Sequence, residues 1–143
     1  MEDNIRIGKI ILNLSNKISR QLNKEASAFG LTGVQAKLIG FIHHRSSTQD
    51  IFQKDIEEEF DIRRSSVTSA LQLMEKKGYI KRVSVSDDAR LKKIVLTEKG
   101  LELDKKVYDA IIKLENSLIN EFDNDELRVL IDSLDRISKK IVD

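Results

Sequence analysis

A run of polar and basic side chains between residues 63 and 76 has the chemistry needed to hydrogen-bond to nucleic-acid bases. Arginine reaches phosphate oxygens or guanine edges, and serine, threonine and glutamine offer donors and acceptors to base edges in a major groove. An ordinary exposed helix face would carry more Glu–Lys pairs, and this run has no acid before Glu75. The candidate contact residues are Arg63, Arg64, Ser65, Ser66, Thr68, Ser69, Gln72 and Lys76.

A second charged group lies around a predicted turn in the segment "SDDARLKK". An arginine at a narrow hairpin tip gains from the negative potential of a minor groove, which suits Arg90. Asp88 could accept hydrogen bonds from Arg90 and hold it in place, whereas turn chemistry alone explains Asp87. The candidate contact residues of this group are Arg82, Asp88, Arg90 and Lys92.

The net charge of +1 conceals an uneven distribution. Residues 62–99 hold 10 Lys and Arg against 4 Asp and Glu, whereas residues 32–61 hold 3 against 6 and residues 100–143 hold 7 against 11. One basic block in a near-neutral chain is typical of a surface that binds a polyanion. Charge alone leaves a solvated lysine-rich surface as an equal alternative.

Several classes of protein are disfavoured by the composition. The chain has no cysteine, which excludes disulfides and zinc–thiolate sites. No segment approaches the ~20 apolar residues of a membrane span, and no apolar run follows the acidic start, so we expect a cytoplasmic protein. We find no Ser–His–acid arrangement and no glycine-rich phosphate loop, and therefore expect neither an enzyme nor a cofactor.

The two histidines, His43 and His44, are adjacent. Neighbouring residues on a helix point about 100° apart, so we do not expect the pair to share one metal ion. One of them could join a site with distant acidic residues, but a histidine without a ligand is the simpler interpretation. We predict no metal site.

The contact residues require a helix followed by a hairpin, and the apolar spacing supplies both. Helical periodicity predicts helices over about 5–29, from 32, over 52–60 and from 61 until Gly78. Thr32 and Gln35 form a predicted capping box, Gly30 and Gly78 are predicted helix stops, and Asp61 is the predicted N-cap of the fourth helix. That helix is expected to bury Val67, Ala70, Leu71 and Met74.

From about residue 80 the spacing of the apolar residues changes from a helical to an alternating pattern. Alternation predicts strands over about 80–85 and 94–96, joined by a turn over 86–93. Thr97 is expected to cap a helix that runs to about 121, and "DNDE" at 123–126 to cap the last helix. The predicted fold class is mainly α with a small β-hairpin. We predict a single domain, residues 1–143, with a winged helix-turn-helix over about 32–99 and dimerisation helices over about 1–30 and 100–143.

The chain resembles the MarR family of transcriptional regulators over essentially its whole length. The resemblance is carried by "LTGVQAKLIGFI" at 31–42, "SSVTSALQLMEKKGYIKR" at 65–82, "DDAR" at 87–90 and "IVLTEKG" at 94–100. It implies a homodimer on a pseudo-palindromic operator, with the fourth helix in the major groove and Arg90 in the flanking minor groove. It also implies a repressor controlled by a small ligand, often aromatic or phenolic. One departure is Glu57, where the family often has a small residue that packs on the recognition helix.

The terminal helices carry wide apolar stripes, which favour packing against a second copy over simple coverage of the winged part. Pocket candidates for a small ligand are Leu14, Ile18, Phe41 and Tyr108, although such residues are more often plain core. Two other functions stay open: a winged-helix protein-interaction module, and a nonspecific DNA-binding protein. Neither repressor versus activator action nor the operator sequence follows from these residues.

Overall fold

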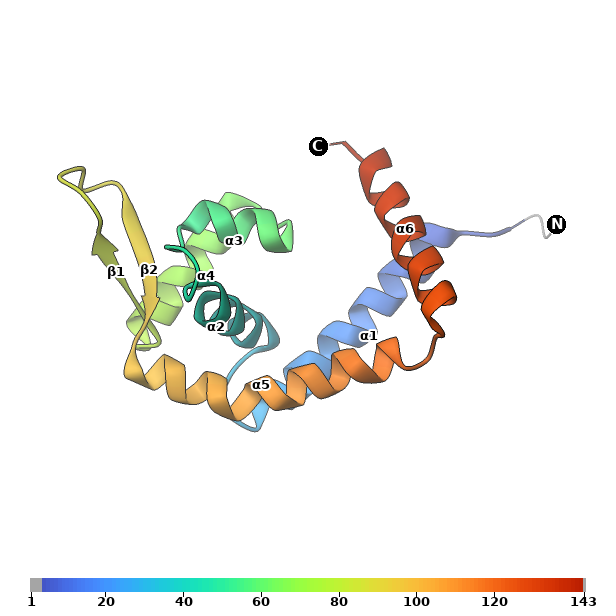
Figure 1. Ribbon diagram of the computed structural model, residues 1–143, viewed down its shortest axis with the longest axis horizontal. Helices are drawn as coiled ribbons and strands as arrows, with labels where there is room; N and C mark the ends of the chain where they lie inside the picture. The colour runs from blue at the N-terminus through green and yellow to red at the C-terminus, as the bar shows by residue number, and fades with distance from the viewer. Residues whose placement is uncertain (1–3, 143) are drawn as a thin grey trace. The chain divides into compact units, whose positions relative to one another are not determined.

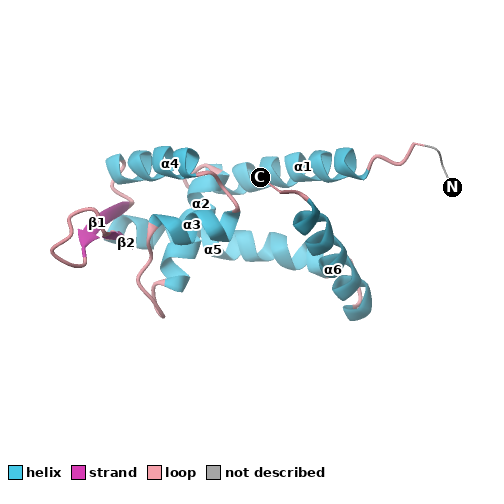
Figure 2. Cartoon of the chain, turned by 90° about the horizontal axis from the view of Figure 1, so that it is seen from above, coloured by secondary structure: helices cyan, strands magenta, loops and turns pink. Residues whose placement is uncertain are grey.

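A computed structural model describes residues 4–142, which form two compact units, one ending at Asp109 and one beginning at Ala110. The described elements, in order, are α1 (Ile7–Ser27), α2 (Gly33–Arg45), α3 (Gln53–Phe60), α4 (Arg64–Lys76), β1 (Ile80–Ser84), β2 (Lys92–Leu96), α5 (Glu98–Ile119) and α6 (Asn124–Lys140). Helices predominate and the strands form one short hairpin, as Figure 2 shows, so the predicted fold class is confirmed. Among these helices, none has the length and apolar character needed to cross a membrane.

α2 is the central helix of the first unit (Figure 1), and it contacts both α1 and β2. Leu38, Ile39 and Ile42 are each no more than 1% exposed. The helix begins with the predicted capping box, because Thr32 accepts from the Gln35 backbone N–H and the Gln35 side chain accepts from Thr32 N–H. The core that surrounds α2 includes Ile51, Ile56, Val67, Leu71, Met74, Ile80, Ile94 and Val107.

The connection between α3 and α4 differs from the prediction at Asp61. This residue has φ +50 and ψ +50, so it ends α3 in the left-handed conformation and does not cap α4. Arg63 occupies the N-cap position of α4 and makes no side-chain cap hydrogen bond. Aspartate tolerates left-handed backbone better than most residues, and it therefore suits a tight turn as well as an N-cap. Sequence preference alone could not separate these two roles.

The hairpin is antiparallel, with Ile80 opposite Leu96, Arg82 opposite Ile94 and Ser84 opposite Lys92. The returning strand begins at Lys92, two residues earlier than predicted, because backbone pairing continues past the apolar part of the strand. The backbone N–H of Ile94 also donates to the Ile51 carbonyl at 2.7 Å. The base of the wing is therefore attached to the segment that precedes α3.

The start of α5 packs closely on the residues between α4 and β1. The Thr97 hydroxyl accepts from the Gly100 backbone N–H, which confirms the predicted cap, and it donates to the Gly78 carbonyl at 2.5 Å. Gly78 has φ +79, as expected for the residue that ends a helix. A Cβ at Gly100 would overlap the Tyr79 carbonyl oxygen, so only glycine fits this approach.

The second unit holds the end of α5 and α6. Asp123 caps α6 in a capping box with Glu126, as predicted. Within this unit no residue of α6 is buried. The exposed apolar side chains of the second unit include Leu118, Ile119, Phe122, Val129, Ile131 and Leu134.

We expect Gly100→Ala to lower the free energy of unfolding by about 1–3 kcal/mol, as overpacking usually does. The added methyl group would meet the Tyr79 backbone, which cannot move aside as a flexible side chain could. The measurement is urea denaturation at fixed protein concentration. Gly8→Ala is the matched control, since a Cβ at this helical position meets nothing within 4 Å. Equal stability of the two variants would show that the α5 start is not constrained as described.

Candidate nucleic-acid interface

α4 presents its polar face to solvent because its apolar face is fully used. Val67, Leu71 and Met74 are no more than 1% exposed, whereas Ala70, predicted to be buried with them, is only partly buried. The exposed residues of the predicted contact set are Arg63, Arg64, Ser65, Ser66, Ser69, Gln72 and Lys76. The structure therefore leaves this set accessible along one helix.

Thr68, the remaining predicted contact on α4, is half-buried and has a partner. The Gln53 side-chain amide donates to the Thr68 hydroxyl at 2.8 Å and to the Arg64 carbonyl at 3.3 Å. Gln53 is the first residue of α3, so the amide joins the start of α3 to the start of α4. The Thr68 hydroxyl accepts here and keeps its own proton available for donation.

The wing tip is ordered by the pair that the sequence suggested. Asp88 Oδ1 accepts from the Arg90 backbone N–H at 3.0 Å and from Arg90 Nε at 3.1 Å, and Asp88 Oδ2 lies 3.4 Å from Arg90 Nη2. The Arg90 side chain is 92% exposed. The side-chain and backbone hydrogen bonds from Arg90 lower the pKa of Asp88. The tip thus presents an oriented guanidinium to solvent.

A cleft opens between α3, the start of α4 and the wing. Among its lining residues that the structure describes, five are cations and one, Glu57, is an acid. Such a cleft attracts an anionic backbone. The cleft is lined by Phe52, Gln53, Lys54, Glu57, Arg64, Arg82, Arg90, Leu91 and Lys92.

The hairpin register decides which of its basic residues reach this cleft. Lys92 is exposed and lines the cleft, whereas Lys93 is directed to Asp50, with Nζ 3.6 Å from the carboxylate. Arg82 Nε lies 4.0 Å from Glu75 Oε2, beyond hydrogen-bond distance, and has no hydrogen-bond partner among residues 4–142. The pairing of Arg82 with Glu75 is therefore a long ion pair rather than a hydrogen bond.

Two residues of the cleft, Gln53 and Lys54, were missed by the sequence reasoning. Lys54 is a single basic residue in an acidic segment, so the charge sum over residues 32–61 hid it. Gln53 has a role only because α3 and α4 are adjacent, which no local pattern encodes. Glu57, the departure from the family pattern, is half-buried and lines the cleft, whereas Ile56 supplies the fully buried side chain of α3.

The candidate ligand-pocket residues have different neighbours. The Phe41 ring packs edge-on against Phe60 at 5.6 Å, and the Tyr108 ring lies 4.3 Å from that of His44. Leu14 is 52% exposed and Ile18 partly buried. A small-molecule site formed by these residues stays a prediction.

The succession of α2, α3 and α4 followed by the basic hairpin of β1 and β2 defines a winged helix-turn-helix protein. The family model described as "MarR family" matches residues 29–91. The transcriptional regulator PecS of Dickeya dadantii is 26% identical over 125 residues, which cover 87% of this chain and 75% of PecS. The transcription regulator MarR of Oenococcus oeni is 27% identical, with a TM-score of 0.83 over 94% of this chain and 99% of that one.

A structure of S. aureus MepR, described as a complex with DNA, has a TM-score of 0.86 over 97% of this chain and 99% of that chain. Its sequence identity is 18%, so this match shows a shared fold. Together, the family-model match and these relatives support a winged-helix transcriptional regulator similar to those of the MarR family.

Replacing Arg90 by Ala should raise the pKa of Asp88 towards its ordinary value, because the side-chain hydrogen bonds, the largest cause of the lowered pKa, are lost. Because the pKa of Asp88 is lowered in the folded protein, its pairing with Arg90 stabilises the fold fully above the ordinary carboxyl pKa. This stabilisation is lost as the pH falls through the lowered pKa. Carboxyl ¹³C NMR titration measures the change, with Lys81→Ala, an exposed residue of β1, as control. An unchanged Asp88 pKa in Arg90→Ala would contradict the assigned pairing.

Proposed function

We propose that the protein is a homodimeric, sequence-specific regulator that binds double-stranded operator DNA through α4 and the wing. The observation that carries the proposal is the continuity of two surfaces at Arg64, which belongs both to the exposed polar face of α4 and to the cationic cleft. A major groove admits one helix, and phosphates beside it need cations on the neighbouring elements. This chain offers both.

The candidate DNA-contact residues divide into those that would contact base edges and those that would contact phosphates. Ser65, Ser69 and Gln72 carry exposed donors and acceptors for base edges, and they would set sequence preference. Arg82 and the lysines of the cleft would contact phosphates, which orient the protein without reading sequence. Arg90, oriented by Asp88, would enter the minor groove beside the helix, where its charge favours A·T-rich sequence.

Exposed apolar side chains support the homodimer. On α1, Ile7, Ile10 and Leu14 are each more than half exposed. In the second unit, Val129 and Ile131 of α6 are likewise more than half exposed. Apolar surface of this extent marks an interaction site, and a second copy would place two α4 helices on two half-sites.

Control by a small ligand and action as a repressor complete the proposal. They are supported by the similarity to the MarR family and by the relatives, whose names describe transcriptional regulators. A small aromatic or phenolic compound would weaken DNA binding by changing the separation of the two reading helices. Binding to operator DNA would place the protein in the cytoplasm.

A protein-interaction module is less well supported, because such a module needs no cationic cleft beside a serine-rich helix. Nonspecific DNA binding would use the cleft but not the small polar side chains of α4. Selection of sites from random duplexes separates these functions. We expect a two-fold symmetric site bound at least ~10³-fold more tightly than a scrambled duplex. Weak binding with no preferred sequence would contradict the proposal.

Substitutions should separate the two roles once a site is known. Ser69→Ala or Gln72→Ala should cost about 1–3 kcal/mol at one base position and change the preference there. Arg90→Ala should weaken binding across sequences, lower the salt slope by about 1, and lose most at A·T-rich flanks. Fluorescence anisotropy at several salt concentrations measures both effects. Lys106→Ala, an exposed change on α5, is the control, and equal scaling by all three test variants would refute the division.

Ile10→Asp should shift the protein towards monomer, because it places a charge on an exposed apolar stripe of α1. Analytical ultracentrifugation over a range of concentrations measures the distribution. Asn16→Asp, an exposed change about 120° around the same helix from Ile10, is the matched control. A dimer of wild-type affinity in Ile10→Asp would exclude this stripe from the interface.

A further inference from the structure

Asp104 is a buried carboxylate that the proposed DNA surface does not use. It lies on α5 and is 1% exposed. Its Oδ1 atom has no hydrogen-bond partner among the described residues, and a Cβ added at Gly40 of α2 would lie 3.6 Å from it. Burying a carboxylate is costly unless a cation or hydrogen bonds compensate its charge. One oxygen of this group therefore lacks compensation inside the chain.

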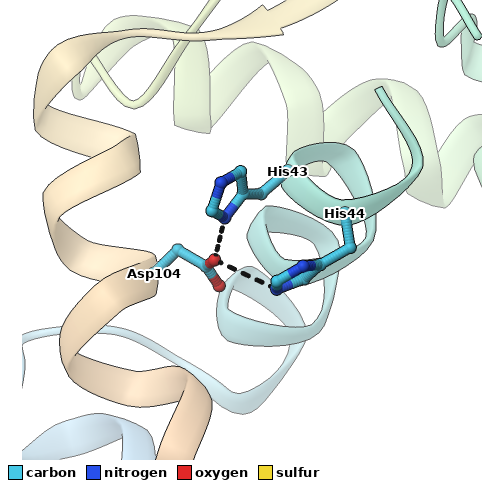
Figure 3. A group of neighbouring side chains, drawn as sticks. All are labelled: His43, His44 and Asp104. Carbon is cyan, nitrogen blue, oxygen red and sulfur yellow. Dashed lines mark hydrogen bonds and ion pairs between the residues drawn. The ribbon is translucent and has the colours of Figure 1, made fainter. Parts of the chain in front are cut away.

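The other oxygen is approached by both histidines of α2. Asp104 Oδ2 is in hydrogen-bond contact with His43 Nδ1 and lies 3.4 Å from His44 Nε2. Figure 3 shows the two rings converging on this carboxylate from the last turn of α2. The ring centroids are 4.6 Å apart, so the 100° step between neighbouring helix residues does not separate the side chains as expected. The sequence argument considered backbone direction and could not include Asp104.

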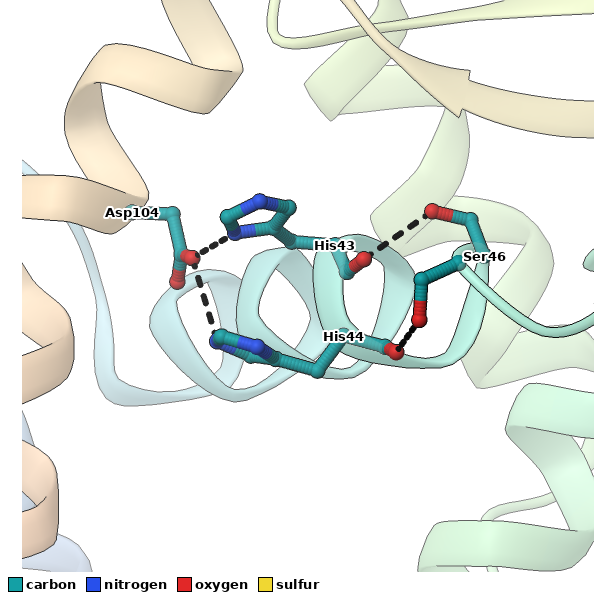
Figure 4. Close-up of polar contacts among 5 residues, drawn as sticks. His43, His44, Ser46 and Asp104 are labelled. Atoms are coloured by element: carbon teal, nitrogen blue, oxygen red, sulfur yellow. Dashed lines mark hydrogen bonds and ion pairs between the residues drawn. The ribbon is translucent and has the colours of Figure 1, made fainter.

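The surrounding contacts hold this arrangement in place (Figure 4). The hydroxyls of Ser46 and Ser47 donate to the His43 and His44 carbonyls at 3.0 and 2.9 Å and complete the end of α2. Tyr108, one turn beyond Asp104 on α5, packs against the His44 ring at an interplanar angle of 39°. The histidine side chains are 34% and 47% exposed, so solvent reaches the cluster from their side.

We propose that His43, His44 and Asp104 bind one divalent transition-metal ion of the Zn²⁺ class. Two imidazole nitrogens and one carboxylate oxygen are a ligand set that such ions favour, whereas Mg²⁺ and Ca²⁺ prefer oxygen ligands alone. One ligand atom from each residue lies within 4.8 Å of the others. Tetrahedral ligands about 2.0–2.1 Å from zinc are roughly 3.4 Å apart, so the cluster is close to the required size.

Binding needs one local adjustment. The direct contact between His43 and Asp104 leaves no room for an ion, so the His43 ring must withdraw by a small side-chain rotation. Its partial exposure permits this movement. The ion would neutralise the buried carboxylate, and its fourth position, on the solvent side, would hold water or an added ligand. Within the first unit, it would join α2 to the first half of α5.

The competing explanation is a purely structural hydrogen-bonded cluster without an ion. It predicts that loss of a histidine affects stability but that no metal binds at this place. The two explanations therefore differ in metal stoichiometry and in the effect of metal on thermal unfolding, both of which can be measured without DNA. Their outcome does not depend on whether the proposed regulatory function is right.

The experiment uses the full chain, freed of any histidine tag and of metal. Co²⁺ and Zn²⁺ are titrated against a chromophoric chelator, and d–d absorption of Co²⁺ reports nitrogen and oxygen ligands. We expect one tight site per chain, with affinity at least ~10-fold lower in His44→Gln and Asp104→Asn. Zn²⁺ should raise the midpoint of thermal unfolding of the wild type, because it binds the folded state. It should not do so for the two variants.

Asp109→Asn is the matched control, since it makes the same change at an exposed residue of the same helix. It should bind both ions like the wild type. His44→Gln keeps the test decisive if Asp104→Asn fails to fold, because the His44 side chain is nearly half exposed. Absence of a tight site in the wild type, or wild-type affinity in folded His44→Gln, would overturn the proposal.

Discussion

The burial of α2 over more than half of its circumference is the constraint on which the first unit depends. Leu38, Ile39 and Ile42 lie on one face of the helix, and the buried residues Gly33 and Ala36 extend the covered surface around more than half of its circumference. A helix enclosed in this way has polar contacts mainly at its ends. Its first turn is closed by the Thr32–Gln35 capping box, and its last turn emerges at His43 and His44. Both the fold and the candidate metal site follow from this enclosure.

The candidate DNA surface depends on how the wing is attached. The base of the hairpin is held by the bond from Ile94 to Ile51 and by the contacts of Thr97 with Gly78 and Tyr79. The tip is held by hydrogen bonds within its own turn, among them the Asp88–Arg90 pair and the bond from the Leu91 N–H to the Asp88 carbonyl. A fixed base sets the direction of the hairpin, and an exposed tip lets Arg90 reach beyond the cleft. The base of the wing is therefore oriented by neutral packing and hydrogen bonds, whereas the Arg90 guanidinium at the tip is oriented by Asp88.

The histidine cluster and the cationic cleft occupy different elements but share α2 as support. α2 contacts β2 directly, and its last turn holds the two histidines. An ion between α2 and α5 would stabilise the helix against which the wing packs. Metal binding and DNA binding would then be linked through stability of the first unit, and the sign of that linkage depends on which arrangement of α2 and α5 each ligand prefers.

Local sequence determined most elements of this protein. Local sequence patterns predicted the features that depend on residues a few positions apart. These features are the helix caps at Thr32, Thr97 and Asp123, the helix end at Gly78 and the polar face of α4. Asp61 was misread because aspartate suits two kinds of helix end. The tertiary structure alone decided the contacts between distant segments. Gln53 meets Thr68, and Asp104 meets two histidines some sixty positions earlier, because packing of whole helices brings them together and no local pattern records that distance.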